Sequence, residues 1–305
     1  MVAPALPGLE TTDFAHRTGC KYSVALAAQQ QGAITAADYD IFRRYLQDAC
    51  GILLGDNKQY LVASRLAQLL REHQIESLTV LVERIKQLRN SDLRQAVIDA
   101  MTTNETLWFR DSYPFEVLVN QILPEYKGQA APVRIWCAAC SSGQEPYSIS
   151  MSVEEYLMRA PGALPGGVQI VGTDISAQML KLAEQGKYEH LALVRGLSPE
   201  RKQRYFEPVD GGERWQVKAN IRRRNSFRAI NLMDSYTAMG RFEVVFCRNV
   251  LIYFSAELKA KIIDKIAGVL QPRGYLFLGA SESMAGLSER FEMIRCNPGI
   301  VYRLK

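Results

Sequence analysis

From about residue 126 to the C-terminus, short apolar runs alternate with longer amphipathic stretches. This alternation constrains the fold more than any other feature of the chain. Strand-length runs separated by helical stretches, here notably 176–184 and 255–270, predict a mostly parallel sheet covered by helices. The predicted strands are 133–137, 168–172, 242–247, 275–278, 291–294 and 300–304.

The region before this alternation has apolar residues at helical spacing and predicts a small helical domain. Thr35 and Asp38 form a start that resembles a capping box. The helix predicted to follow Gly55 carries Lys58, Arg65 and Arg71 on its polar side, which gives the domain a basic face. Its last three predicted helices are 58–72, about 78–88 and about 92–101.

One stretch, 195–228, interrupts the alternation and holds ten basic residues against four acidic ones. With the turn Gly211-Gly212 between alternating segments, it predicts a small antiparallel unit inserted before Asn231. Long insertions are often functional, although the same charges also fit a solvated basic surface. The predicted parts are a loosely ordered tail (1–32), a helical domain with its linker helix (33–103) and a sheet domain (104–305), the last with an inserted β-subdomain at about 197–228.

The composition is that of an ordinary soluble globular chain: of 305 residues, 48% are hydrophobic and 23% are charged. The formal charge of +5 is mild and suggests an acidic partner surface without requiring nucleic acid. The six cysteines are scattered, and the pair Cys137 and Cys140 has no second pair or nearby His to complete a zinc site. We therefore expect reduced, mostly buried thiols in a cytoplasm, and no metal. No apolar stretch of about 18 residues occurs, so we expect no membrane insertion.

The first predicted strand runs into a loop of small residues, 138–142, which is followed by Gly143, Glu145 and Pro146. This is the crevice where open α/β sheets bind cofactors. A single glycine does not make the GxGxxG cradle that holds a pyrophosphate. Glu145, at the start of the next predicted helix, is placed to accept the ammonium group of a cofactor that carries an amino acid.

The second predicted strand ends in Asp174. A carboxylate at this point can accept both ribose hydroxyls of an adenosine. The alternative is that Asp174 only caps the following helix, but Ser176 is available for that role. Two further segments, 102–110 and 246–254, place polar side chains in apolar surroundings. Because unpaired buried polar groups are costly, we expect those groups to meet each other or a ligand.

Five motifs occur in order and at compatible spacing: Asn104-Glu105-Thr106 with Phe109-Arg110, then 142–148, 172–175, Asn231-Leu232 and 246–254. Together they resemble the CheR family of chemotaxis receptor methyltransferases, from about residue 38 to the C-terminus. The turn Asn297-Pro298-Gly299 also predicts a terminal antiparallel strand pair, which distinguishes methyltransferase sheets from most dinucleotide-binding sheets. The resemblance implies a class I fold dependent on S-adenosylmethionine (SAM): a Rossmann-like seven-stranded sheet, an N-terminal helical domain and an inserted antiparallel β-subdomain.

In this family the cofactor is SAM, and the substrate is a glutamate on the cytoplasmic coiled coil of a receptor. The resemblance implies that Arg110 and Tyr253 lie beside the transferable methyl group. It also implies that the helical domain faces the receptor through Lys58, Arg65 and Arg71. The implied cofactor contacts are Asn104, Thr106, Arg110, Glu145, Asp174, Asn231, Leu232, Arg248 and Asn249.

The expected reaction needs no general base, because a glutamate with a pKa of about 4.3 is ionised at neutral pH. Catalysis then depends on in-line positioning and partial desolvation. We expect Arg110 to orient the cofactor and substrate carboxylates and Tyr253 to place the attacking oxygen. The chain departs from the usual family pattern at Gln144, where an acidic residue is common, and at Trp108, where Phe is common. Neither change removes an implied cofactor contact.

The expected partner is the Glu-rich methylation helix of a receptor, which the basic faces of the helical domain and the insert would attract. In some family members the insert also binds a receptor tail by strand addition, but the short loop at Gly211-Gly212 disfavours tail binding here. We expect a cytoplasmic monomer that is recruited to membrane receptor arrays through the receptors.

Three alternatives stay open. A methyltransferase acting on RNA or on another protein would use the same fold, although the insert lacks the clustered aromatic residues of a base-stacking platform. An NAD oxidoreductase would need the missing glycine fingerprint. A protein that senses SAM without catalysis would be expected to lack Arg110 or Tyr253, and both are present.

Overall fold

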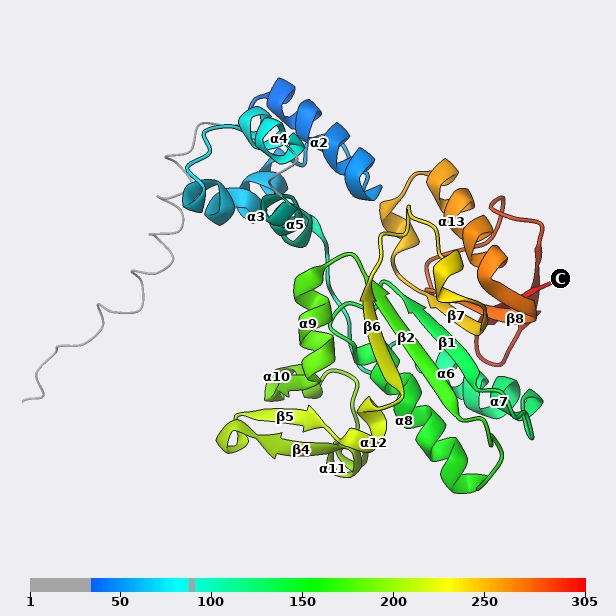
Figure 1. Cartoon of the computed structure of the whole chain (residues 1–305). Helices are drawn as coiled ribbons and strands as arrows, with labels where there is room; N and C mark the ends of the chain where they lie inside the picture. The colour runs from blue at the N-terminus through cyan, green and yellow to red at the C-terminus, as the bar shows by residue number, and fades with distance from the viewer. Residues whose placement is uncertain (1–33, 88–90) are drawn as a thin grey trace, which may run out of the picture.

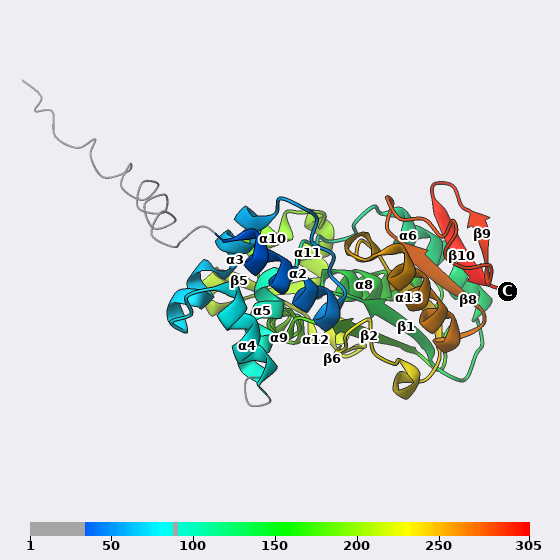
Figure 2. The same ribbon diagram turned by 90° about the horizontal axis from the view of Figure 1, so that it is seen from above.

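The computed structural model describes residues 34–87 and 91–305, so the predicted tail lies outside the described residues. The described chain forms a four-helix domain, a seven-stranded sheet with helices on both faces, and a separate three-stranded sheet (Figure 1). Figure 2 shows the helical domain and the small sheet at one end of the molecule and the last two strands at the other.

The helical domain has a hydrophobic core of its own, in which Phe42 and Leu46 are fully buried. The predicted capping pair is present: the Thr35 hydroxyl oxygen accepts the N–H of Asp38, and the hydroxyl donates to the Asp38 carboxylate. Gly51 ends the first described helix in a left-handed conformation, with φ of 76°. The four helices are α2 (Ala36–Cys50), α3 (Gln59–Glu72), α4 (Leu78–Lys86) and α5 (Ser91–Met101).

The predicted sheet is confirmed, with strand order β6-β2-β1-β7-β8-β10-β9. The first five strands in this order pair in parallel, whereas β10 runs antiparallel to both β8 and β9. The terminal antiparallel pair is therefore also confirmed. The strands are β1 (Val133–Ala138), β2 (Val168–Asp174), β6 (Asn225–Ala229), β7 (Phe242–Cys247), β8 (Leu270–Leu278), β9 (Phe291–Arg295) and β10 (Ile300–Leu304).

Alternate residues of the central strands enter two separate cores. Ile135 and Cys137 of β1 belong to the core under α8, and Trp136 and Ala138 belong to the core under α13. The first core lies under α6 (Tyr113–Val117), the π-helix η1 (Leu118–Ile122), α7 (Leu123–Glu125), α8 (Gln144–Arg159) and α9 (Ala177–Gln185); the second lies under the 3₁₀ turns η3 (Thr237–Met239) and η4 (Leu251–Tyr253) and α13 (Ala256–Val269). The apolar runs of the sequence are therefore buried on both faces, as parallel strands require.

The insert is an antiparallel three-stranded sheet of order β3-β5-β4. Its elements are β3 (Lys187–Glu189), α10 (His190–Leu193), α11 (Pro199–Tyr205), β4 (Phe206–Val209), the 3₁₀ turn η2 (Asp210–Gly212) and β5 (Arg214–Val217), and α12 (Ala219–Arg222) follows. The predicted range of about 197–228 differs from this arrangement at both ends. The first strand lies earlier and is only three residues long, so it gives no pattern. The last predicted residues form β6, an edge strand that stays partly exposed and therefore looks polar.

Two hydrogen bonds tie the end of α2 and the loop after it to the sheet domain. The Leu53 N–H donates to the Tyr253 carbonyl at 2.9 Å. The Asn231 side-chain amide donates to the Ala49 carbonyl at 2.8 Å. Because Asn231 follows β6 and Tyr253 follows β7, the helical domain is fixed above the carboxyl ends of the strands.

Candidate active site

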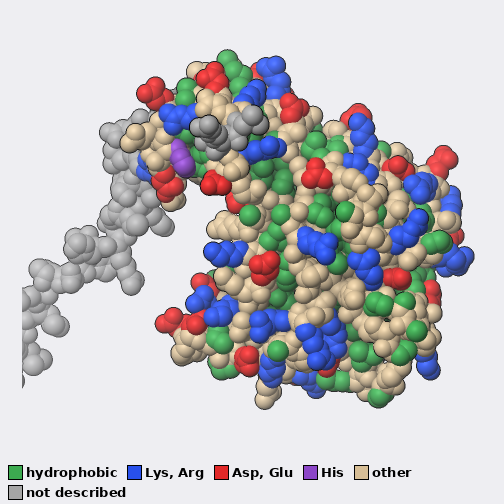
Figure 3. Space-filling view, in the orientation of Figure 1, with side chains coloured by type: hydrophobic (Ala, Val, Ile, Leu, Met, Phe, Trp, Pro, Cys, Tyr) green, Lys and Arg blue, Asp and Glu red, His purple; other side chains and the backbone are tan. Residues whose placement is uncertain are grey.

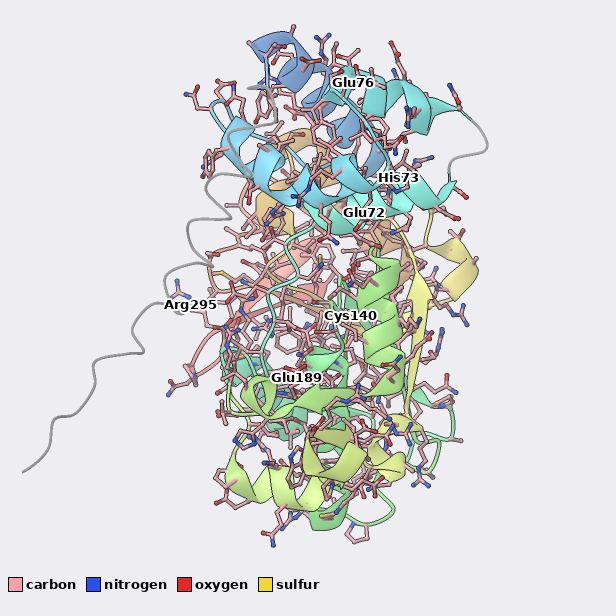
Figure 4. The ribbon with its side chains drawn as sticks, turned by 90° about the vertical axis from the view of Figure 1, so that its left-hand side faces the viewer. Glu72, His73, Glu76, Cys140, Glu189 and Arg295 are labelled. Atoms are coloured by element: carbon pink, nitrogen blue, oxygen red, sulfur yellow. The ribbon has the colours of Figure 1, made fainter. Side chains whose placement is uncertain are left out.

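The carboxyl ends of β1, β2 and β7 open into a cavity that the helical domain covers. Figure 3 shows the surface hollowed between the helical domain and the insert. Figure 4 looks at this side and places Cys140, in the cavity wall, between His73 of the helical domain and Glu189 of the insert. The cavity is lined by every residue implied as a cofactor or methyl contact: Asn104, Thr106, Arg110, Glu145, Asp174, Asn231, Leu232, Arg248, Asn249 and Tyr253.

The loop after β1 turns sharply, and both Ala139 and Ser141 have positive φ, at 58° and 50°. Two hydrogen bonds hold it in this conformation. The Cys140 N–H donates to the Thr173 carbonyl, and the Ser141 N–H donates to the Asp174 carboxylate, both at 2.8 Å. The small residues predicted from the sequence therefore form a tight turn against the end of β2.

The single glycine of this loop has a packing role. Gly143 caps α8 with φ of 92°, and a Cβ at this position would lie 2.9 Å from the Cβ of Ala183 in α9. Any side chain here would strain the backbone and push the two helices apart. The glycine is thus explained by the contact between α8 and α9.

Asp174 has a buried carboxylate at the end of β2. Its two oxygens accept the N–H groups of Ser141 and Ser176 at 2.8 and 2.9 Å. Burial raises the pKa of Asp174, although these N–H groups favour its ionised form. The cap of α9 is Ser176, whose hydroxyl accepts the N–H of Met179. Each Asp174 oxygen therefore keeps a lone pair that can accept a hydrogen bond from a ligand.

Arg248, directly after β7, has a side chain that is 1% exposed. Its Nη1 donates to Glu145 at 2.8 Å, and its Nη2 donates to the Arg110 carbonyl at 2.8 Å and to the Asp111 carboxylate at 2.7 Å. Burial raises the pKa of Glu145, and the neighbouring Arg248 opposes this effect. The Arg248 Nε has no hydrogen-bond partner within 34–87 and 91–305. Sequence reasoning missed Asp111, although it lies directly after a recognised motif.

Asn249 is held in an unusual conformation, with φ of 59°. Glu282, in the loop after β8, accepts its N–H at 2.7 Å and also accepts the N–H groups of Leu251 and Gly279, at 2.8 and 2.7 Å. One carboxylate thus shapes the loop that carries Asn249 and leads to Tyr253. Sequence reasoning missed Glu282 because it lies in no recognised motif.

The segment 104–110 lies along the cavity, and two of its anchors are in the loop after β1 and in α8. The Ser141 hydroxyl donates to the Asn104 carbonyl at 2.9 Å, and the Phe109 N–H donates to the Ser148 hydroxyl at 3.1 Å. Arg110 follows the second anchor directly. The side chain of Asn231, by contrast, is engaged within the protein: its amide donates to the Ala49 carbonyl, and its oxygen accepts the Met233 N–H at 3.0 Å.

Comparison with known families agrees with this geometry. The all-alpha domain of the CheR methyltransferases matches residues 37–102, and their SAM binding domain matches residues 104–300. The chain belongs to the CheR methyltransferase family. A chemotaxis protein methyltransferase of Vibrio parahaemolyticus is 55% identical over 90% of this chain and 99% of its own length. Chemotaxis protein methyltransferase 1 of Pseudomonas aeruginosa is 56% identical over 88% of this chain and 98% of its own, and the Escherichia coli chemotaxis protein methyltransferase is 31% identical over 89% and 93%.

One of the three basic residues that the CheR resemblance assigns to the receptor-facing surface is turned inward. The Arg65 guanidinium donates to the carbonyls of Met101 and Thr102 at 2.7 and 3.2 Å, and to the Thr103 hydroxyl at 3.0 Å. It therefore closes the C-terminal end of α5, directly before Asn104, and lines the cavity. Sequence spacing shows which helix side carries Arg65 but does not show that α5 ends opposite it.

The other two basic residues, Lys58 and Arg71, are exposed. The Arg71 Nε donates to the Ala67 carbonyl within its own helix, and the Lys58 Nζ lies 5.7 Å from the ring centroid of exposed Tyr60. Arg65 is thus separated in environment from Lys58 and Arg71, which lie on the solvent side of the CheR helical domain.

This difference in environment predicts different SAH affinities for two Arg→Ala variants of α3. Arg65→Ala removes three hydrogen bonds that order the residues before Asn104, so we expect it to weaken S-adenosylhomocysteine (SAH) binding by about tenfold. Arg71→Ala should leave the dissociation constant unchanged. Calorimetric titration with SAH measures both. Equal affinities in the two variants would contradict this role of Arg65.

Among the described residues, no three or more His, Cys, Asp or Glu side chains are grouped so as to hold a metal ion. The same part of the chain contains no helix with the length and apolar character needed to cross a membrane. Cys137, Cys140 and Cys247 of this CheR protein are buried free thiols, and burial raises the pKa of all three. Cys20 lies outside the described residues.

Proposed function

We propose that this chain transfers the methyl group of SAM to glutamate side chains of chemoreceptors and forms glutamate methyl esters for chemotactic adaptation. The names of its close relatives support a chemotaxis protein methyltransferase. The observation that carries the proposal is the gathering of ten motif residues around one cavity beneath the helical domain. On this basis the chain acts as a protein-glutamate O-methyltransferase.

The cavity residues fit SAM in their chemistry. The free lone pairs of Asp174 suit the two ribose hydroxyls, and the Glu145 carboxylate suits the ammonium group. The Asp174 carboxylate is buried and the Glu145 side chain is only 14% exposed, so their hydrogen bonds to a ligand are strong. Arg248 supports the cofactor by fixing Glu145, and its Nε, which has no partner among the described residues, is left as a donor. Five further proposed cofactor contacts also line the cavity: Asn104, Thr106, Asn231, Leu232 and Asn249.

Bound SAM supplies an electrophilic methyl group on a sulfonium sulfur. The receptor glutamate attacks as a carboxylate, so a carbon–oxygen bond forms while the carbon–sulfur bond breaks, and no proton has to be removed. The work of the protein is therefore orientation. Arg110 attracts the carboxylates of substrate and cofactor, and the Tyr253 hydroxyl positions the attacking oxygen; both residues line the cavity.

The proposed receptor contacts lie around the cavity opening. Lys58 and Arg71 are exposed on the helical domain and suit a Glu-rich methylation helix. Arg65 is assigned instead to the cavity wall. The chain is proposed to act as a cytoplasmic monomer at receptor arrays. The short turn at Gly211-Gly212 disfavours receptor-tail binding at the insert.

The decisive experiment supplies SAM with a labelled methyl group to the purified protein and receptor-containing membranes. Methyl esters release methanol in alkali, so base-labile label in a receptor band supports glutamate esterification. Membranes without receptors are the control. If the protein binds SAH tightly and no receptor is labelled, the fold and the cofactor stand and the proposed substrate is wrong.

The raised pKa of Glu145 predicts a pH-dependent affinity for SAH. The ligand ammonium stabilises ionised Glu145, so its pKa is lower in the complex than in the free protein. Near and below the raised pKa of the free protein, Glu145 is protonated and must release its proton when the ligand binds. The affinity for SAH therefore falls as the pH falls through that pKa. We expect several-fold weaker binding at about pH 5 than at about pH 7.

Glu145→Gln is the matched variant for this titration. It should bind SAH more weakly at neutral pH and lose the part of the pH dependence that comes from Glu145, whereas Asp174 retains its own contribution in the same direction. Calorimetry in two buffers of different ionisation enthalpy reports the released protons. Parallel pH profiles for the two proteins would refute the pairing of Glu145 with the ammonium group.

A further inference from the structure

The residue two positions before Arg110 is buried in the insert. Trp108 is fully buried, and its ring makes edge-on contacts with Tyr188 of β3 and Phe206 of β4, at centroid distances of 4.9 and 5.2 Å. Its indole N–H donates to the Ala192 carbonyl of α10 at 3.1 Å. A Phe at this position could not make that bond. The indole N–H of Trp108 therefore adds a contact between the insert and the site.

The main chain makes the same connection. The Trp108 N–H donates to the Arg195 carbonyl at 3.1 Å, and the Arg195 guanidinium pairs with Glu105 at 2.8 Å. The next residue, Gly196, has φ of 93°, and a Cβ there would lie 2.1 Å from the Trp108 carbonyl oxygen. The loop after α10 thus runs in close contact with the segment 105–108.

A second contact from the insert reaches Phe109. The Arg201 guanidinium of α11 lies 3.8 Å from the centroid of the Phe109 ring. Its Nε and Nη2 donate to the two Glu155 oxygens at 2.8 and 2.9 Å, and Glu155 belongs to α8. This bidentate pair fixes the plane of the guanidinium over the ring. Arg201 therefore clamps Phe109 between the insert and the helix that carries Glu145.

The backbone around Arg110 needs such support. Phe109, Asp111 and Ser112 all have positive φ, at 49°, 65° and 49°. Side-chain-bearing residues adopt this region only at an energetic cost, and they stay there when their surroundings impose it. On one side Arg248 binds the Arg110 carbonyl and Asp111. On the other side the support comes from the insert.

We infer that the insert is a positioning element for Arg110, which acts through Trp108 and Phe109, and that Arg201 is a positioning residue. This rests on the proposed role of Arg110 toward the cofactor but not on the receptor substrate. Without the clamp on Phe109, the strained turn relaxes and Arg110 no longer faces the cavity consistently. The insert then serves cofactor binding whether or not a receptor tail binds to it.

The test is a double-mutant cycle on the dissociation constant for SAH, measured by calorimetry on the full chain. We expect Arg201→Ala to weaken binding about fivefold. In an Arg110→Ala background, Arg201→Ala should add nothing, because the residue through which it acts is gone. Arg201→Lys keeps the charge but not the planar fork, so it should weaken binding nearly as much as Arg201→Ala. Arg204→Ala is the matched control, since Arg204 is exposed on the same helix.

Three outcomes of the cycle would contradict the positioning role of Arg201. Wild-type affinity in Arg201→Ala, together with weakened binding in Arg110→Ala, would overturn this inference alone. Full additivity of the two variants would also overturn it, because a general structural defect does not depend on Arg110. Wild-type affinity in Arg110→Ala would overturn the role of Arg110 and this inference with it. Trp108→Phe gives an independent check, since it removes the bond to Ala192. It should weaken SAH binding in the protein that retains Arg110 and have no effect in the Arg110→Ala background.

Discussion

We expect Asp174→Asn to weaken the binding of SAH by about 100-fold. The buried carboxylate is proposed to accept two ribose hydroxyls, and each charge-assisted hydrogen bond contributes about 1.5 kcal/mol or more. The substitution also turns an amide donor toward the N–H of Ser141 or Ser176, which the carboxylate now accepts. Calorimetric titration of the purified variant measures the change directly.

Asp92→Asn is the control for this variant, because Asp92 is exposed in the first turn of α5 and distant in role from the cavity. Thermal melting without ligand separates a folding defect from a binding defect. If Asp174→Asn melted normally and bound SAH within about threefold of wild type, the ribose assignment would be wrong.

Arg110→Ala should lower kcat/KM for receptor methylation by about a thousandfold. The Arg110 guanidinium is proposed to contact both the cofactor carboxylate and the substrate carboxylate. Its loss should therefore weaken binding and also disturb the in-line geometry. Misplacement alone can cost about 100-fold in rate. Steady-state transfer of labelled methyl to receptor membranes gives the ratio, and single turnovers at saturating SAM isolate the chemical step.

Two further variants test whether the effect belongs to this side chain. Arg110→Lys retains the positive charge without the planar fork and should recover only part of the activity. Arg223→Ala removes an exposed arginine after α12 and should leave kcat/KM unchanged. A single-turnover rate in Arg110→Ala equal to wild type would mean that Arg110 only binds and does not orient.

The sheet was predictable because its strands are buried on both faces and therefore read as continuous apolar runs. The starts of several helices could also be recognised from their capping residues. Thr35, Ser176 and Ser255 each accept an N–H from the residue three positions further on. The edge strand β6 was not legible, since it pairs on one side only and carries exposed Ser226 and Arg228. Its polar pattern placed it in the insert.

Within the site, the motifs predicted which residues line the cavity but not which contacts each side chain makes. Arg65 closes the end of α5, and the Asn231 side chain joins two domains; both facts depend on where distant segments meet. Glu282 shapes the Asn249 loop from 33 residues away, through bonds to main-chain N–H groups. Bonds of this kind accept any residue type as donor, so no sequence pattern records them.

The contacts that fix the helical domain to the sheet domain also have a consequence for unfolding. Leu53 binds the Tyr253 carbonyl, and Asn231 binds Ala49, so residues of the cavity wall are themselves the joint between the two parts. Detachment of the helical domain would remove the cover of the cavity, whereas the proposed cofactor contacts would stay on the sheet domain. A ligand that binds better under the covered cavity favours the joined state, so we expect SAH to raise the melting midpoint of the helical domain together with that of the sheet domain. Cofactor binding thereby strengthens the attachment of the helical domain to the sheet domain.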